Sequence, residues 1–237
     1  RHGYRTIALS GVSKSLYNMG TAQRDLGFDE LLNPLDFPEW GGKPLPSHFV
    51  SDEELGRYAR QILARPGRPP LLLFVLSMMQ YGPYDSAHPI RFGLDRLGLR
   101  RDQAARLSDY ATRMVATDVA ALAFGARLLD GPRPAVFAYF GDHQPNLGQP
   151  ITYRERLAQP QYLTSYVVKT NLMPPAAAAP AAPLDITYLG AIVLEAAGLP
   201  LDPLFDANRR MRRLPSVLSV PRCSVSPRAT STRRCAR

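Results

Sequence analysis

An aspartate and a histidine stand next to each other where an apolar segment gives way to polar residues. Residues 135–140 (AVFAYF) are typical of a buried strand, and Gly141, Asp142 and His143 follow directly. In open α/β sheets, ligands bind outside the carboxyl ends of the strands. Because zinc and manganese accept carboxylate and imidazole ligands, we expect Asp142 and His143 to bind a divalent metal. The alternative, from these letters alone, is an aspartate that caps a turn beside a surface histidine.

Strand-like and helix-like segments alternate along the chain around this pair. Strands are expected at residues 4–9, 71–78, 135–140 and 162–169, and helices at residues 15–26, 51–64, 102–129 and 186–197. Ser51 and Glu54 have the spacing of a capping box, and Asp185 is placed to cap the last helix. This alternation predicts an α/β fold, with a mostly parallel sheet and helices on both of its faces.

The long predicted helix at residues 102–129 carries an apolar heptad and several charged residues. Its heptad positions, which we expect to face the sheet, are Leu107, Met114, Ala121 and Leu128. Asp109 and Arg113 are four residues apart, which predicts an ion pair on the surface of the helix. Asp118 lies among apolar residues and is expected to accept a hydrogen bond from a neighbouring loop.

The net charge of +9 comes from the end of the chain. Nine arginines and no acid lie in residues 209–237, so the other 20 basic residues balance the 20 acids. Residues 1–208 therefore lack the basic surface that nucleic-acid binding needs, and we expect no nucleic-acid partner. The last segment also holds both cysteines and is rich in Ser, Pro and Arg, which is typical of disorder. We predict a folded part at 1–208 and a basic, disordered tail at 209–237.

Several segments, in this order and spacing, match motifs of one family. They are GYRTIAL (3–9), SLYNMGTAQRDLGFDEL (15–31), LFVLSMMQYGPYD (73–85), LSDYATRMVATDVAALAF (107–124), VFAYFGDHQPNLG (136–148) and YLTSYVVKTN (162–171). Together they resemble the motifs of lipoteichoic-acid-synthase-like proteins, a phosphoglycerol-transferase branch of the sulfatase/alkaline-phosphatase superfamily. The resemblance covers about residues 1–210. It implies an alkaline-phosphatase-like fold that is incomplete at its N-terminal side.

The resemblance also implies a reaction. In that family a divalent metal (Mn, Mg or Zn) activates a Thr or Ser nucleophile, which attacks a phosphodiester or sulfate ester. By position, Asp142 and His143 match two of the metal ligands. The nucleophile and another acidic ligand would precede Arg1, so no catalytic nucleophile is assigned in this chain. Ser10 and Ser13 are interpreted as loop serines.

The chain departs from the family pattern at three positions. Ser10 and Tyr81 stand where the family has histidines, and Met19 stands where it has an arginine. The residues expected to bind substrate are Tyr17, Asn18, Tyr81 and His88. Each lost histidine removes a group that stabilises a nonbridging oxygen or protonates a leaving group. Two hypotheses follow: the site serves a different ester, or the site is degenerate.

The resemblance implies a substrate and a location. The expected activity is that of a metal-dependent sulfatase-like hydrolase or transferase acting on phosphodiester (phosphoglycerol) or sulfate esters of envelope glycolipids or polysaccharides. The expected partner is thus a phospholipid or glycan ester. Family members work at the cell membrane, with an extracytoplasmic catalytic domain on an N-terminal anchor, which we expect to be missing here. The alternative is a catalytically inactive fragment or pseudoenzyme that keeps the fold.

Overall fold

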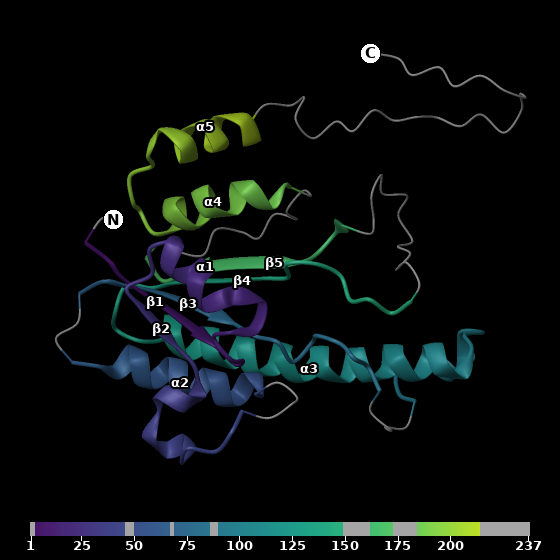
Figure 1. Ribbon diagram of the computed structural model, residues 1–237. Helices are drawn as coiled ribbons and strands as arrows, with labels where there is room; N and C mark the ends of the chain where they lie inside the picture. The colour runs from purple at the N-terminus through teal and green to yellow at the C-terminus, as the bar shows by residue number, and fades with distance from the viewer. Residues whose placement is uncertain are drawn as a thin grey trace, which may run out of the picture. The chain divides into compact units, whose positions relative to one another are not determined.

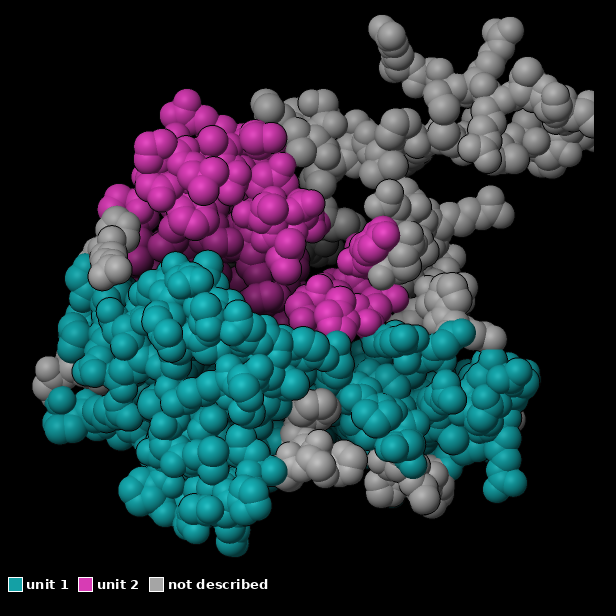
Figure 2. Space-filling model, in the orientation of Figure 1, with its two compact units in different colours: residues 1–126, 145–149 teal, residues 127–144, 150–237 magenta. Residues whose placement is uncertain are grey.

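The computed structural model divides into two compact units. Unit 1 contains residues 1–126 and 145–149, and unit 2 contains residues 127–144 and 150–237 (Figures 1 and 2). The structure describes residues 3–45, 50–66, 69–85, 90–148, 162–172 and 184–213, except the side chain of Asp95.

Unit 1 is built on a three-stranded parallel sheet. Its strands are β1 (Arg5–Ser10), β2 (Glu30–Leu32) and β3 (Leu71–Leu76), in the order β2-β1-β3. Along β1 and β3 the register runs from Arg5 opposite Leu71 to Ser10 opposite Leu76. The predicted strands at 4–9 and 71–78 are therefore confirmed, whereas β2 was not foreseen because three residues carry no visible period.

Helices lie against both faces of this sheet. The helical segments that begin in unit 1 are η1 (Leu16–Asn18), α1 (Met19–Asp25), η2 (Pro34–Asp36), η3 (Pro38–Trp40), α2 (Asp52–Ala64), η4 (Leu94–Arg96) and α3 (Arg101–Leu129). On one face, Ile7 and Leu9 of β1 pack with the apolar side of α2 in one buried core. On the other face, the ring of Phe28, just after α1, lies 6.1 Å from that of Phe74. The predicted α/β architecture is thus present (Figure 1).

Helix α2 begins where the sequence predicts. The Ser51 hydroxyl accepts a hydrogen bond from the Glu54 backbone N–H at 3.2 Å, which satisfies one of the unpaired donors of the first turn. The Glu54 carboxylate bonds to Arg57. Leu55, Tyr58 and Ile62 then recur along the buried side of the helix.

Helix α3 has a different buried stripe from the one its heptad predicts. The heptad residues are only half-buried. The fully buried residues are Ala104, Ser108, Asp109, Thr117 and Gly125. A heptad drifts around a straight helix with 3.6 residues per turn, so it does not define one face over 29 residues. Small and polar residues form the buried face of α3, and neighbouring loops form hydrogen bonds with the polar ones.

The described part of unit 2 contains an antiparallel pair of strands and two helices. The strands are β4 (Val136–Phe140) and β5 (Tyr166–Thr170), paired from Val136 opposite Thr170 to Phe140 opposite Tyr166. The helical segments are η6 (Ile186–Tyr188), α4 (Leu189–Ala196) and α5 (Pro203–Arg212). Asp185 caps the first of these, as predicted, by accepting from the Thr187 N–H at 2.9 Å.

Helix α5 was not predicted, and it continues past residue 208. Asp202 caps it, and its last turn is basic, as the dipole of a helix favours. Arg212 and Arg213 pair with Glu195 of α4 at 2.7 and 3.4 Å. The first arginines of the predicted tail therefore have partners in unit 2, while residues 214–237 lie outside the described part. Within the described ranges, no helix has the length and apolarity that crossing a bilayer requires.

Candidate active site

Asp142 and His143 follow β4 directly and are both largely exposed. Their side chains are 72% and 54% exposed. The His143 backbone N–H donates to Asp142 Oδ1 at 2.8 Å, so this carboxylate oxygen bonds within the turn that follows β4. His143 Nδ1 lies 2.8 Å from the Gln144 carbonyl oxygen, and His143 Nε2 lies 3.7 Å from Asp142 Oδ2. The structure thus turns both side chains toward each other.

The segment before β5 holds this turn in place. The Gly141 N–H donates to the Ser165 carbonyl at 3.1 Å, and the Thr164 hydroxyl donates to the Gly141 carbonyl at 2.8 Å. Gln144 Nε2 donates to the Leu163 carbonyl at 2.9 Å. A Cβ atom at position 141 would lie 3.3 Å from Thr164 Cβ, so glycine permits the close approach. The turn is therefore fixed by bonds on both sides of the Asp-His pair.

The two side chains fit as part of a divalent metal site. The carbonyl of Gln144 favours the tautomer with the proton on Nδ1, which puts the lone pair of the neutral ring on Nε2. Two ligands of a tetrahedral cation, each about 2.1 Å from it, stand roughly 3.4 Å apart. The observed 3.7 Å is close to that span. Across the described ranges no group of three His, Cys, Asp or Glu side chains gathers, so these residues do not complete a ligand set.

Unit 1 brings together two of the predicted substrate residues. The Tyr17 hydroxyl donates to the Tyr81 hydroxyl at 3.5 Å. Tyr17 lies beyond β1 and is 70% exposed, and Tyr81 lies beyond β3. The pair is thus at the carboxyl ends of two parallel strands, where α/β sheets bind ligands. Asn18 is exposed next to Tyr17, whereas His88 lies outside the described residues.

The backbone at Tyr17 and Asn18 is strained. Their φ angles are 51° and 54°, which lie in the left-handed region that residues other than glycine seldom adopt. The Gly20 N–H bonds to the Lys14 carbonyl at 2.8 Å, and a Cβ at position 20 would lie 3.1 Å from that oxygen. Lys14 is held in turn by Asp36 at 2.9 Å. The surroundings therefore impose a conformation that exposes Tyr17 to solvent. Strained residues of this kind often occur at functional sites.

A polar network missed by sequence reasoning anchors the chain after β3. Ser77 donates to Asp52 Oδ1 at 2.6 Å, and Gln80 Nε2 donates to Asp52 Oδ2 at 2.7 Å. The buried Thr117 hydroxyl donates to Asp52 and accepts from Gln80. Asp118, which the sequence suggested for such a role, is exposed. The available signal was the pair of polar residues, Ser77 and Gln80, directly after an apolar strand.

The Asp109–Arg113 pair is buried rather than on the surface. The side chains are 3% and 18% exposed, and Arg113 makes a two-pronged contact with Asp109 at 3.1 and 2.8 Å. The prediction of a surface ion pair was wrong because helical spacing says nothing about what covers the helix. Here the chain after β3 covers it, and Arg113 also donates to the carbonyls of Met79, Tyr81 and Pro83.

Neither serine considered near β1 has the setting of a nucleophile. Ser10 is buried, and its hydroxyl accepts from the Val12 N–H at 3.3 Å, which stabilises the turn after β1. Ser13 and Ser15 share a hydroxyl–hydroxyl bond of 2.8 Å at the surface. Ser13 is thus a loop serine, as interpreted, whereas Ser10 is the last residue of β1 and is paired with Leu76 of β3.

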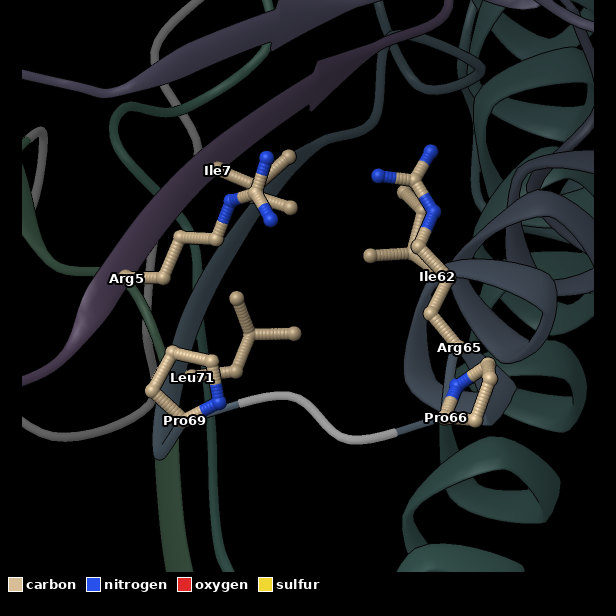
Figure 3. A pocket seen from close by; sticks show the side chains of 7 residues that line it. All are labelled: Arg5, Ile7, Ile62, Arg65, Pro66, Pro69 and Leu71. Carbon is tan, nitrogen blue, oxygen red and sulfur yellow. The ribbon is translucent and has the colours of Figure 1, made fainter.

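A small pocket lies at the opposite, amino-terminal end of the parallel strands. Arg5 from β1 and Arg65 from the end of α2 flank it, above apolar side chains (Figure 3). Both arginines pair with Glu30 of β2. The pocket contains none of the predicted site residues, and its charges are those of a structural ion-pair network that joins two strands and a helix.

Tyr84 provides a test of how the chain that follows β3 is packed. Burial, with Tyr110 nearby, raises the pKa of Tyr84 to about 12, and its hydroxyl donates to the Gln80 carbonyl at 2.6 Å. The fold favours the neutral phenol, so this stabilisation is complete below pH ~10 and is lost as the pH rises toward 12. In a titration of tyrosinate absorbance, Tyr84→Phe should remove one late-titrating equivalent. Loss of an equivalent near pH 10 instead would contradict the assignment.

Comparisons with known proteins give a family match and a relative of similar sequence. The Sulfatase family profile matches residues 1–199. An uncharacterized protein of Haemophilus influenzae is 32% identical over 224 residues, which make up 90% of this chain and 40% of that protein. The chain therefore spans less than half the length of this relative.

Two solved structures share the fold. The Streptococcus pyogenes phosphoglycerol transferase GacH, in complex with sn-glycerol-1-phosphate, aligns with a TM-score of 0.60 at 18% identity, over 87% of this chain and 59% of that chain. A Vibrio parahaemolyticus protein of the alkaline phosphatase superfamily aligns with a TM-score of 0.52 at 18% identity, over 86% and 47%. Together with the profile match over most of its length, this places the chain in the sulfatase family, with an alkaline-phosphatase-like fold.

Proposed function

We propose that this chain is the C-terminal part of the catalytic domain of a metal-dependent hydrolase or transferase that acts on a phosphodiester or sulfate ester. The observation that carries the proposal is the Asp142–His143 pair, with its two donor atoms 3.7 Å apart at the end of β4. A divalent cation there would neutralise charge on nonbridging ester oxygens and lower the pKa of an attacking hydroxyl. No attacking hydroxyl is assigned in this chain.

The chain's own residues have defined tasks in this proposal. Asp142 supplies a hard oxygen ligand, and Gln144 orients the His143 ring through Nδ1. Tyr17 and Tyr81 bind the substrate, because two phenols 3.5 Å apart can donate to neighbouring oxygens of one phosphate or sulfate group. Asn18 lies beside them, and His88 is retained as a further candidate.

Phosphoglycerol esters of envelope glycolipids or polysaccharides are the proposed substrates. The support is the fold shared with a phosphoglycerol transferase that was solved with sn-glycerol-1-phosphate. From the motif resemblance alone, we also propose that the catalytic domain lies outside the cytoplasm, at the cell membrane. Residues 209–237 form a basic tail on this domain in the proposal, although α5 reaches Arg212.

Titration calorimetry tests the proposal in two steps. Mn²⁺ or Zn²⁺ should bind the purified chain, and Asp142→Ala should weaken binding at least 100-fold, because one of two identified ligands is lost. Asp130→Ala, an exposed aspartate in the same unit, serves as the matched control and should leave affinity unchanged. Next, sn-glycerol-1-phosphate should bind more tightly with the metal present. A wild-type chain that binds neither metal would favour the alternative below, and metal binding that Asp142→Ala leaves unchanged would refute the role given to Asp142.

The alternative is a protein that keeps the fold without the reaction. Two observations favour it. Ser10, which stands where the family has a histidine, is buried. Among the described residues, no third His, Cys, Asp or Glu joins Asp142 and His143 to form a metal site. It predicts that sn-glycerol-1-phosphate binds equally well with and without metal, or not at all. The second calorimetric step therefore separates the two hypotheses.

A further inference from the structure

One guanidinium, that of Arg113, bonds to three carbonyls of the chain that follows β3. Arg113 of α3 uses Nε and Nη2 for the two Asp109 oxygens, Nη1 for the carbonyls of Met79 and Tyr81, and Nη2 again for Pro83. These contacts employ all five N–H donors of an arginine. Such complete use of the donors within the protein indicates a structural clamp, and not a side chain kept for a ligand.

The clamp acts on the backbone on both sides of Tyr81. The three accepting carbonyls belong to alternate residues, and the shortest of these bonds, 2.9 Å, is made by Tyr81 itself. Fixing the carbonyls of residues 79, 81 and 83 fixes the peptide planes around Tyr81 and hence the direction of its Cα–Cβ bond, from which the side chain extends. We infer that Arg113 is a positioning residue, which holds the Tyr81 hydroxyl where it meets Tyr17.

Further contacts stiffen the same segment and point to preorganisation. The Arg113 guanidinium lies 5.5 Å from the centre of the Tyr84 ring, and Tyr84 packs edge-on against Tyr110 with ring centres 5.6 Å apart. Asp52 anchors the segment independently through Gln80. A binding group that is fixed before the ligand arrives loses less conformational entropy on binding.

Lysine cannot replace this arginine. An ammonium group has three donors and no planar fork, so Arg113→Lys keeps the charge beside Asp109 but cannot reach all five acceptors. Arg100 gives a matched control, because its two-pronged contact with Asp102 at 3.1 and 2.8 Å is on the surface. Arg100→Lys removes the same geometry without touching the loop.

The first measurement needs no ligand. In a chain labelled with ¹³C in the tyrosine rings, the Tyr81 signal is identified by its loss in Tyr81→Phe. Arg113→Lys should shift and broaden this signal and speed amide exchange at residues 79–82, whereas Arg100→Lys should not. If Arg113→Lys does not fold, Asp109→Asn is compared in its place. An unchanged Tyr81 signal in the folded variant overturns the inference.

The second measurement depends on the proposed function. With sn-glycerol-1-phosphate as the probe, Tyr81→Phe and Arg113→Lys should each weaken binding about tenfold, near the loss of one hydrogen bond. The double variant should bind as weakly as Tyr81→Phe alone, because both changes act through one hydroxyl. Additive losses contradict the positioning role. A wild-type chain that does not bind the probe refutes the proposed function, and the ring signal still decides the inference.

Discussion

Asp109→Ala is expected to lower the free energy of unfolding of unit 1 by about 3–5 kcal/mol, the usual cost of removing one partner of a buried ion pair. Asp109 is 3% exposed, and its carboxylate pairs with the Arg113 guanidinium through two hydrogen bonds. Without it, a cation that is 18% exposed is left with neutral carbonyl acceptors. Urea unfolding followed by circular dichroism measures the change.

Asp102→Ala is the control for this prediction. Asp102 makes the same kind of two-pronged contact, with Arg100, but both side chains are well exposed. Solvent screening makes such pairs weak, so the urea midpoint should hardly move. Equal shifts for Asp102→Ala and Asp109→Ala would show that burial does not govern the strength of the inner pair.

Tyr58→Ala is expected to cost about 3–5 kcal/mol, because it empties the centre of the core between α2 and the parallel sheet. The side chain is fully buried, and its ring centre lies 4.3 Å from that of Phe37. Arg57 lies over the ring at 4.5 Å and donates to the hydroxyl at 3.0 Å. The loss should appear in thermal and urea unfolding alike.

Tyr58→Phe separates the ring from its hydroxyl. This variant keeps the packing and gives up one hydrogen bond, so it should cost only about 1 kcal/mol. If Tyr58→Phe proved as damaging as Tyr58→Ala, the hydrogen bond with Arg57, and not the filled core, would account for the stability of this region.

Local patterns in the sequence were sufficient to predict most of the helices and strands. The strands β1, β3 and β4 are apolar runs between breakers, and the caps at Ser51 and Asp185 are short-range signals that the structure confirms. β2 was not predicted, because a strand of three residues is defined by its pairing with a partner, here β1, and not by its own sequence period. α5 was not predicted, because most of its residues are polar and the apolar pattern of an amphipathic helix is weak.

The candidate site depended on contacts between distant segments, which spacing along the chain cannot reveal. Asp142 and His143 are neighbours in sequence, so their proximity was predictable, but the role of Gln144 in orienting the ring was not. Tyr17 and Tyr81 were selected separately, by family resemblance, and only the fold brings their hydroxyls together. The burial of Arg113 likewise depends on carbonyls supplied by another loop.

The strand order of unit 1 has a consequence for how the protein forms. β1 and β2 are joined through η1 and α1, so both strands of this pair lie within residues 5–32. β3 completes the other side of β1 only after residues 11–70 have been made, and closing so long a loop is slow. Until then one edge of β1 stays open to strands from other chains, and expression at low temperature or with a chaperone should raise the soluble yield.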